Sequence, residues 1–246
     1  MALSRPSPSA EARVAGIFYA ITIVTAIFAE VAVRGNLVDL NDAAATARNI
    51  LGAESLYRLG FAADLAAGAS YLVVTLLLYD LLRPVGPRVA LLSVFFSIVG
   101  VAVGAVNGLA HLAPLLVLKG APYLASLGTP QLNALALLSL KLHVIGANIG
   151  LAFFGVYCIL VGYLIFRSTF LPRVIGVLMV LAGCALLTHA LAMTLAPAFA
   201  SMASPYLLGI DGIGEIALTL WLLAMGVNVR NWERVSAASM QSATTT

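Results

Sequence analysis

Charged residues are scarce in this sequence. Only 9% of its 246 residues are Asp, Glu, Lys or Arg, whereas 62% are apolar. Soluble domains contain about 25% charged and about 45–50% apolar residues, so an ordinary soluble domain is excluded. A nucleic-acid-binding surface is excluded as well, because the basic residues occur singly and not in clusters.

Cysteine is also scarce. Cys158 and Cys184 are the two cysteines, and each lies inside an apolar run without the C-x-x-C spacing of redox or zinc motifs. We interpret both as small buried apolar residues, and we predict no cofactor. The spacings H-x-x-H and H-E-x-x-H, which are typical of zinc enzymes, are absent too. An enzyme is therefore the less favoured class of function.

The sequence is rich in long apolar runs. A membrane core roughly 30 Å thick is crossed by about 20 apolar residues in a helix, and helices satisfy their own backbone hydrogen bonds in lipid. The sequence therefore predicts an all-α polytopic membrane bundle with six transmembrane helices. We expect these near residues 14–33, 57–82, 89–112, 140–166, 174–195 and 207–227.

The basic residues predict the topology, because loops rich in Lys and Arg face the cytoplasm. One side carries the larger number: Arg5, Arg13, Arg83, Arg88, Arg167, Arg173, Arg230 and Arg234. The other side carries Arg34, Arg48, Arg58, Lys119 and Lys141. We therefore expect both termini in the cytoplasm and the protein in a bacterial cytoplasmic (inner) membrane. The lipid bilayer is the expected partner, and the oligomeric state is left open.

The expected domain organisation is simple. A single six-helix transmembrane domain should cover residues 11–232. The segments 1–10 and 233–246 are polar and have little to bury, so we expect them to be disordered cytoplasmic tails.

Two helix starts carry capping residues. Ser7 followed by Pro8 suits the N-cap and the first position of a helix. On the outer side, Asp42 is a second N-cap candidate. It predicts a short surface helix near residues 42–51 that ends at Gly52.

Strongly polar side chains recur at a common depth in the predicted helices. Counted from the arginine at each cytoplasmic end, they lie about 15 to 19 residues away, which is roughly 22–29 Å along a helix. We interpret them as the lining of a polar pocket in the outer half of the bundle that binds or passes a small molecule, a cation or a proton. The expected ligand-binding residues are Glu30, Asp64, Asn107, Asn148, His189, Asp211 and Glu215.

Asp211 and Glu215 are the strongest members of this set, because Ile210 and Ile213 continue the apolar sequence around them. A carboxylate that faces lipid costs roughly 2.5 kcal/mol or more, so both side chains should point into the bundle. They lie one helical turn apart on one face. Two ionised carboxylates at that spacing repel each other, so one should take up a proton or both should share a cation.

Small residues share helix faces with two other polar groups. Gly60 lies four residues before Asp64, and Gly104 and Gly108 flank Asn107. Small residues at this spacing allow helix backbones to approach closely. Asp64 and Asn107 should therefore face neighbouring helices.

Two alternatives remain open. His111, His143 and His189 lie in the outer half of the predicted helices, and with a carboxylate they could hold zinc with an open water position, as in a metal-dependent intramembrane hydrolase. Their spacing does not require such a site. In the other alternative the protein is a non-catalytic membrane subunit or stress protein, and its polar groups serve only as hydrogen bonds between helices.

Several stretches of the sequence carry a family resemblance. They are ARVAGIFY at 12–19 through FAE at 28–30, LYRLGFAADL at 56–65, LNALALLSLKLHVIGANIGLAFFGVYCILVGYLIFRS at 132–168 and FLPRVIGVL at 170–178. In these stretches the chain resembles domain of unknown function 4386, a family of bacterial multi-pass membrane proteins. The resemblance would extend over residues 12–232. It implies no activity, so it assigns no role to any residue.

Overall fold

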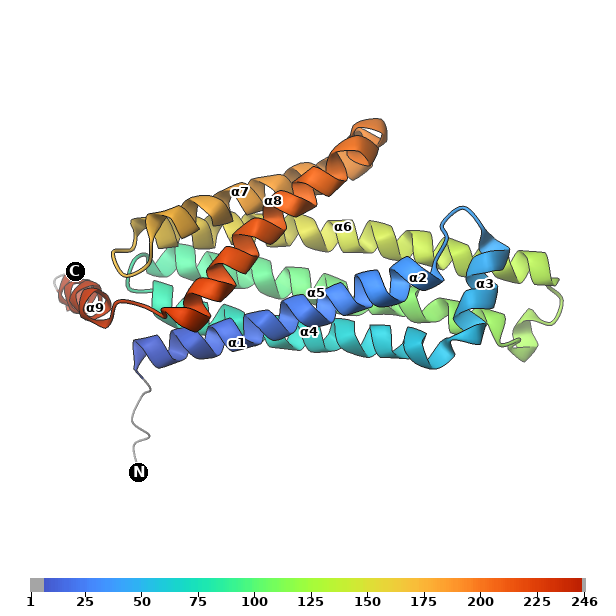
Figure 1. Ribbon diagram of the computed structural model, residues 1–246, viewed down its shortest axis with the longest axis horizontal. Helices are drawn as coiled ribbons and strands as arrows, with labels where there is room; N and C mark the ends of the chain where they lie inside the picture. The colour runs from blue at the N-terminus through green and yellow to red at the C-terminus, as the bar shows by residue number, and fades with distance from the viewer. Residues whose placement is uncertain (1–6, 245–246) are drawn as a thin grey trace, which may run out of the picture. The chain divides into compact units, whose positions relative to one another are not determined.

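The structure is a computed structural model that describes residues 7–244. That part of the chain contains helices and short connections and no β-strand, which confirms the all-α prediction. The helices in chain order are α1 (Pro8–Ile27), α2 (Gly35–Leu37), α3 (Ala43–Gly52), α4 (Glu54–Leu82), α5 (Pro87–Leu118), α6 (Thr129–Arg167), α7 (Arg173–Leu195), α8 (Pro197–Ala224) and α9 (Val229–Thr244), with a π-helical segment at Phe28–Arg34 and a 3₁₀ turn at Pro122–Leu124 (Figure 1).

Six helical segments are long and apolar enough to cross a membrane, as predicted. They are Pro8–Leu37, Glu54–Leu82, Pro87–Leu118, Thr129–Arg167, Arg173–Leu195 and Pro197–Ala224. Large apolar side chains are exposed along them, among them Val106, Leu109 and Leu116 on α5. Extensive exposed apolar surface is typical of contact with lipid. The protein is therefore an integral, multi-pass membrane protein.

The two predicted helix caps are confirmed. The backbone N–H of Ala10 donates to the Ser7 Oγ at 3.3 Å at the start of α1. The backbone N–H of Ala45 donates to the Asp42 Oδ1 at 2.9 Å, and α3 ends at Gly52. These side chains satisfy N–H groups that have no partner inside their own helix.

The first membrane-spanning segment contains an irregularity that the sequence analysis did not predict. After α1 the chain forms the π-helical segment Phe28–Arg34 and then continues directly into α2. Each π-helical turn accommodates an extra residue, and such segments are frequent at functional sites. This one carries Glu30 and Arg34.

The chain divides into two compact units, which are described separately. Unit 1 comprises Met1–Ala20, Tyr71–Gly100 and Gly150–Thr246, and unit 2 comprises Ile21–Ser70 and Val101–Ile149. Helices α1, α4, α5 and α6 each contribute one segment to each unit.

Glycines hold α6 against α7 in unit 1. Gly155 lies against Gly183, and Gly162 lies against Gly176. A Cβ atom on Gly176 would lie 2.7 Å from the carbonyl oxygen of Gly162, and one on Gly183 would lie even closer to the carbonyl oxygen of Gly155. The two glycines on each helix are seven residues apart, so they lie on one face. The two backbones thus approach too closely for any side chain.

Helix α8 is packed in the same manner. It lies against α7 (Figure 1), where a Cβ on Gly214 would lie 2.8 Å from the carbonyl oxygen of Leu178. On α1, a Cβ on Gly16 would lie 2.9 Å from the backbone nitrogen of Leu223. Close contact between backbones therefore stabilises unit 1 on three of its helix pairs.

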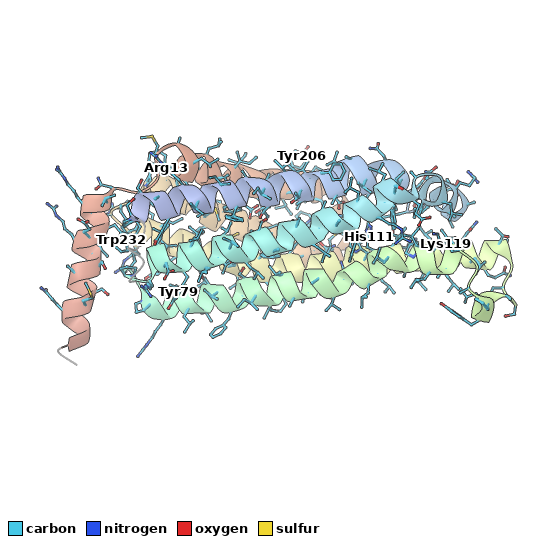
Figure 2. All side chains as sticks on the ribbon, turned by 90° about the horizontal axis from the view of Figure 1, so that it is seen from below. Arg13, Tyr79, His111, Lys119, Tyr206 and Trp232 are labelled. Atoms are coloured by element: carbon cyan, nitrogen blue, oxygen red, sulfur yellow. The ribbon has the colours of Figure 1, made fainter. Side chains whose placement is uncertain are left out.

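Helix α9 is attached to the rest of unit 1 by hydrogen bonds. The Trp232 indole Nε1–H donates to the carbonyl oxygen of Leu81 at 3.0 Å, and the Asn231 side chain donates to that of Thr169 at 2.9 Å. Arg13 and Trp232 lie at the same end of the unit (Figure 2).

The two predicted tails differ from expectation. Helix α1 already starts at Pro8, and α9 runs through Thr244 where residues 233–246 were expected to be disordered. Residues 1–6 and 245–246 lie outside the described part. Low hydropathy predicts that a segment is not buried, but Ala, Met, Gln, Glu and Arg still favour a helix, and the hydrogen bonds of Asn231 and Trp232 fix where α9 begins.

Unit 2 has its own apolar core. Its buried residues are Val33, Leu37, Ile50, Tyr57, Leu115 and Leu140, so the short helix α3 is attached through Ile50.

Two of the three glycines predicted to lie against a neighbouring helix do so. A Cβ on Gly60 would lie 2.8 Å from the Val33 side chain and one on Gly108 would lie 2.7 Å from that of Phe61, whereas Gly104 has nothing within 4 Å.

Candidate functional site

Two helices of unit 1 build a group that we call the acidic cluster: Cys158, Asp211 and Glu215. Asp211 and Glu215 lie one turn apart on α8, and Cys158 lies on α6. The Cys158 Sγ and one carboxylate oxygen of each acid lie within 4.8 Å of one another. In the part of the chain that the structure describes, this is the one group of three metal-ligating side chains with that spacing.

Three tyrosines accompany the acidic cluster. The hydroxyl of Tyr19, which is fully buried, donates a hydrogen bond of 2.9 Å to the Glu215 Oε1. The Tyr19 ring meets the Tyr71 ring edge to face at 5.6 Å between centroids, and the Tyr71 ring lies 5.5 Å from that of Tyr157. The Tyr71 hydroxyl is close enough to interact with charge on Cys158 and Glu215. The rings therefore form an apolar wall that brings hydroxyl groups to the carboxyl groups.

Three polar atoms of this region have no hydrogen-bond partner among the described residues. They are the Oδ1 of Asp211 and the hydroxyl oxygens of Tyr71 and Tyr157, all of which are shielded from solvent. Tyr71 is 5% exposed and Tyr157 is 1% exposed. Buried polar groups are normally hydrogen-bonded. A water molecule, an ion or another ligand would supply the absent partners.

No basic side chain neutralises the two carboxyl groups within the described residues of unit 1. The ion pair found in that unit joins Arg83 to Asp80 at 3.5 Å. Two carboxylates at close range in a medium of low dielectric constant repel each other strongly. The acidic cluster can therefore take up a proton shared between its carboxyl groups, or a cation.

Unit 2 contains a different polar arrangement, centred on Arg34. The Arg34 Nη1 lies 2.6 Å from the Asp64 Oδ2 and its Nη2 lies 3.1 Å from the Asp64 Oδ1, so the pair is bidentate. The Arg34 Nε also donates to the Glu30 Oε2 at 2.7 Å. Bidentate pairs between arginine and a carboxylate are among the strongest charged hydrogen bonds. Glu30 and Asp64 are thus both bonded to Arg34, which neutralises them, and their role as pocket-lining residues stays a prediction.

Two pairs of side chains in unit 2 form what we call reciprocal clamps, in which each side chain bonds the other residue's backbone. In the first, the Tyr57 hydroxyl donates to the carbonyl oxygen of His111, and the His111 Nε2 lies 3.2 Å from the carbonyl oxygen of Tyr57. The two rings are stacked at 4.2 Å between centroids. This clamp joins α4 to α5.

The second reciprocal clamp joins α5 to α6. The Asn107 Nδ2 donates to the carbonyl oxygen of His143 at 2.8 Å, and the His143 Nδ1 lies 3.2 Å from the carbonyl oxygen of Asn107. The Asn107 amide fits because Gly146 has no side chain there, since a Cβ on Gly146 would overlap it. Asn107 and His111 are four residues apart, so both clamps use one face of α5.

The contacts of the clamps show which nitrogens of His111 and His143 carry the proton. An arginine can only donate, so the His111 Nδ1, at 3.5 Å from the Arg34 Nη1, accepts and its Nε2 carries the proton. The His143 Nδ1 faces a carbonyl oxygen, so that atom carries its proton. The group of metal-ligating side chains found in the structure contains no histidine. The zinc site on His111, His143 and His189 stays an untested alternative.

The two other predicted site residues have unsatisfied atoms. The Asn148 Nδ2 donates to the carbonyl oxygen of Val144 at 2.8 Å, but its Oδ1 is buried without a partner. His189 is 6% exposed, and its Nδ1 is without a partner in the described chain. A single pocket lined by all seven predicted residues stays a prediction.

Sequence reasoning missed several residues of these arrangements. Arg34 was counted only as a basic residue of an outer loop, and Cys158 was interpreted as a small apolar residue. Tyr19 and Tyr57, each fully buried, were not singled out. A tyrosine inside a membrane span carries a hydroxyl that needs a partner, and that requirement was the available indication.

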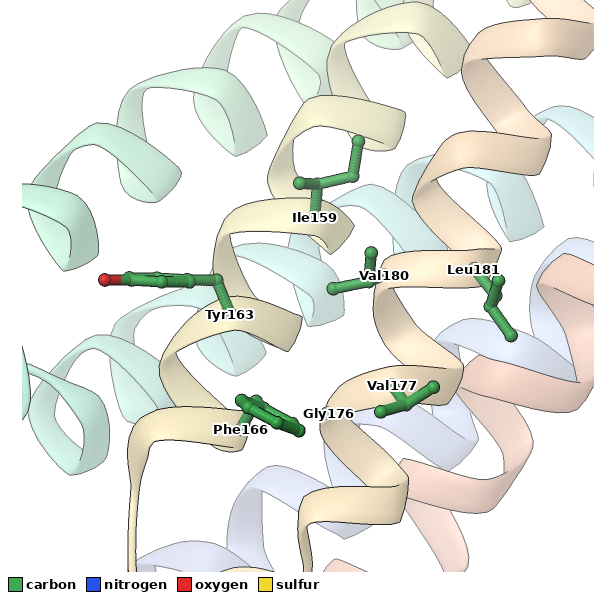
Figure 3. Close-up of a pocket in the computed structure, with 7 residues that line it drawn as sticks. All are labelled: Ile159, Tyr163, Phe166, Gly176, Val177, Val180 and Leu181. Carbon is green, nitrogen blue, oxygen red and sulfur yellow. The ribbon is translucent and has the colours of Figure 1, made fainter.

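An apolar pocket lies elsewhere in unit 1, between α6 and α7. It has a volume of about 310 Å³ and is lined by Ile159, Tyr163, Phe166, Gly176, Val177, Val180 and Leu181 (Figure 3). The ring of Tyr163 points away from α7 in this view. None of the predicted polar residues lines this pocket.

Comparison with known proteins identifies the family. A family model described as a domain of unknown function, DUF4386, matches residues 14–226, so the chain belongs to this family and the resemblance noted in the sequence is confirmed. No similar protein of curated function and no similar solved structure was found.

Proposed function

We propose that this member of the DUF4386 family binds a cation at the acidic cluster, as part of binding or transporting a small cationic solute, a metal ion or a proton. One observation carries the proposal: Asp211 and Glu215 lie inside a membrane-spanning helix without an ion pair in the described residues of unit 1, and the Asp211 Oδ1 is buried without a partner.

The electrostatic argument is direct. A buried charge without a partner costs several kcal/mol, and ionisable groups inside membrane spans are rare unless they serve a function. A bound cation would neutralise the carboxylates and supply the partner that the Asp211 Oδ1 lacks. The hydrogen bond from Tyr19 would keep Glu215 oriented whether or not the cation is bound.

The wider pocket and the location belong to the same proposal. His189 belongs to the same unit as the acidic cluster and carries an unpartnered polar atom, which supports its role as a further lining residue. The excess of arginines in the short loops supports an orientation in which both termini lie on the cytoplasmic side of a bacterial inner membrane.

Unfolding of the purified full-length protein in nanodiscs tests the proposal. Thermal stability is measured in a series of pH values and in NaCl, KCl, MgCl₂ and ZnCl₂ at matched ionic strength, for the parent, Asp211→Asn and Glu215→Gln. Asp80→Asn is the matched control, because Asp80 is a half-buried acid of the same unit that pairs with Arg83. A cation at 100 times its Kd should stabilise the parent by about 2.7 kcal/mol.

The proposal predicts this stabilisation in the parent and in Asp80→Asn, and its loss in Asp211→Asn and Glu215→Gln. Equal responses of all four proteins to every cation and to pH would overturn it.

A second candidate function is a non-catalytic membrane subunit, and the reciprocal clamps of unit 2 favour it. There the polar side chains are used to join helices, as in a purely structural protein. Equal responses in the experiment above would leave this candidate in place.

A further inference from the structure

We infer that the acidic cluster is a site for a thiolate-binding divalent transition metal, with Zn²⁺ as the representative ion and Cys158, Asp211 and Glu215 as its ligands. This inference rests on the proposed function and names its ligand class.

The ligand geometry is the first argument. Zinc binds thiolate sulfur at about 2.3 Å and carboxylate oxygen at about 2.0–2.2 Å, so tetrahedral ligand atoms lie roughly 3.5 Å apart. The Cys158 Sγ and the two carboxylate oxygens already lie within 4.8 Å of one another without a metal. Small rotations of side chains would bring them to coordination distance.

The ligand types select the metal. Magnesium and calcium prefer sites made entirely of oxygen, whereas a thiolate favours zinc and related transition metals. Cys158 is fully buried, while Cys184 is exposed. The thiol proton of Cys158 would be released on binding, because the thiolate is the ligand.

The surroundings of the cluster provide a second, independent observation. Tyr71 is only 5% exposed, and its hydroxyl has no hydrogen-bond partner in the described chain. This hydroxyl is close enough to interact with Cys158 and Glu215. Such a group would hydrogen-bond a water molecule in the fourth position of a three-ligand zinc site. Tyr19 already holds Glu215 by a hydrogen bond, as an outer-shell residue does.

The charges of the site are also compatible with a divalent ion. A thiolate and two carboxylates carry three negative charges against two positive ones. The Tyr19 hydrogen bond to Glu215 offsets part of the excess. No positively charged side chain among the described residues of unit 1 forms an ion pair with the cluster, so the metal ion would be its main positive charge.

Cobalt provides a direct test, because a thiolate bound to Co²⁺ gives a charge-transfer absorption in the near ultraviolet. The full-length protein in nanodiscs, stripped with EDTA, is titrated with Co²⁺ and then with Zn²⁺, and bound metal is measured by mass spectrometry. The parent should bind one ion per chain with this absorption, and Zn²⁺ should abolish it by displacement.

The variants assign the ligands. Cys158→Ser should lose the absorption, whereas Cys184→Ser, the matched control, should keep it. Asp211→Asn and Glu215→Gln should each weaken Co²⁺ binding by at least about tenfold. If Cys158→Ser does not fold, these two variants test the site in its place.

The outcomes separate the two proposals. If the parent binds no Co²⁺ or Zn²⁺ beyond the amount bound by Cys158→Ser, the metal site is wrong. If Na⁺, K⁺ or protons still stabilise the parent through Asp211, the proposed cation site survives that failure. If the parent and Asp211→Asn respond alike to every cation tested, both proposals are wrong.

Discussion

In unit 2, Tyr57 and His111 bond each other's backbone carbonyls, and Arg34 holds two carboxylates. In unit 1, by contrast, the hydroxyls of Tyr71 and Tyr157 have no partner in the described chain. Helices of unit 1 are joined by glycines whose backbones touch. In unit 1, close backbone packing joins the helices and leaves Tyr71, Tyr157 and Asp211 with atoms available for a ligand. In unit 2, the side chains of the clamps and of the Arg34 ion pairs are already used to join helices.

The Arg34 ion pairs of unit 2 should give the largest effect on stability. Arg34→Leu leaves Asp64 and Glu30 without their partner, and we expect the free energy of unfolding to fall by about 3 kcal/mol. The Arg34 side chain is 13% exposed, whereas that of Arg58, which pairs with Glu54, is 54% exposed. Arg58→Leu, the control, should cost less than about 1 kcal/mol. Unfolding in mixed micelles with increasing SDS measures both, and equal losses would contradict the comparison.

The glycine contacts of unit 1 should come next. Gly183→Ala places a Cβ against the backbone of Gly155, and such overpacking costs about 1–3 kcal/mol. Gly212 on α8 has nothing within 4 Å, so Gly212→Ala should instead stabilise the helix by up to about 1 kcal/mol. The same unfolding assay measures the difference. A neutral Gly183→Ala would show that α6 and α7 do not approach as closely as described.

The reciprocal clamps should each make a smaller contribution. Tyr57→Phe removes the hydroxyl that bonds the His111 carbonyl but keeps the stacked ring, and we expect a loss of about 1 kcal/mol. Tyr206 is 76% exposed, so Tyr206→Phe should change stability by less than about 0.5 kcal/mol. If the two variants unfold alike, the clamp does not stabilise unit 2.

The smallest effect is expected for Asp211→Asn in unit 1, and Asp64→Asn in unit 2 is its comparison. Asp64→Asn weakens a paired carboxylate and should cost about 2 kcal/mol. Asp211→Asn removes a carboxylate that has no ion pair in the described part of unit 1, so in EDTA and low salt it should change stability by less than about 0.5 kcal/mol or raise it. Unfolding of both variants under these conditions measures the contrast. Equal losses would mean that Asp211 also has a structural partner.

The sequence by itself determined the features that depend on neighbouring residues. The six membrane spans follow from the number of consecutive apolar residues, and the start of α3 follows from Asp42 and its own backbone. The ends of the spans were less accurate. The fourth begins at Thr129 and not near residue 140, because the helix extends beyond the length needed to cross the membrane core.

Only the tertiary structure decided which polar groups meet. In lipid, every face of a helix is apolar, so the pattern of apolar residues does not show which face contacts a neighbour. The sequence singled out Asp64 as a polar group inside its span but could not pair it with Arg34, thirty positions earlier. It placed Asp211 and Glu215 on one face of α8, but only the packing of α6 against α8 added Cys158 and turned two acids into a candidate metal site.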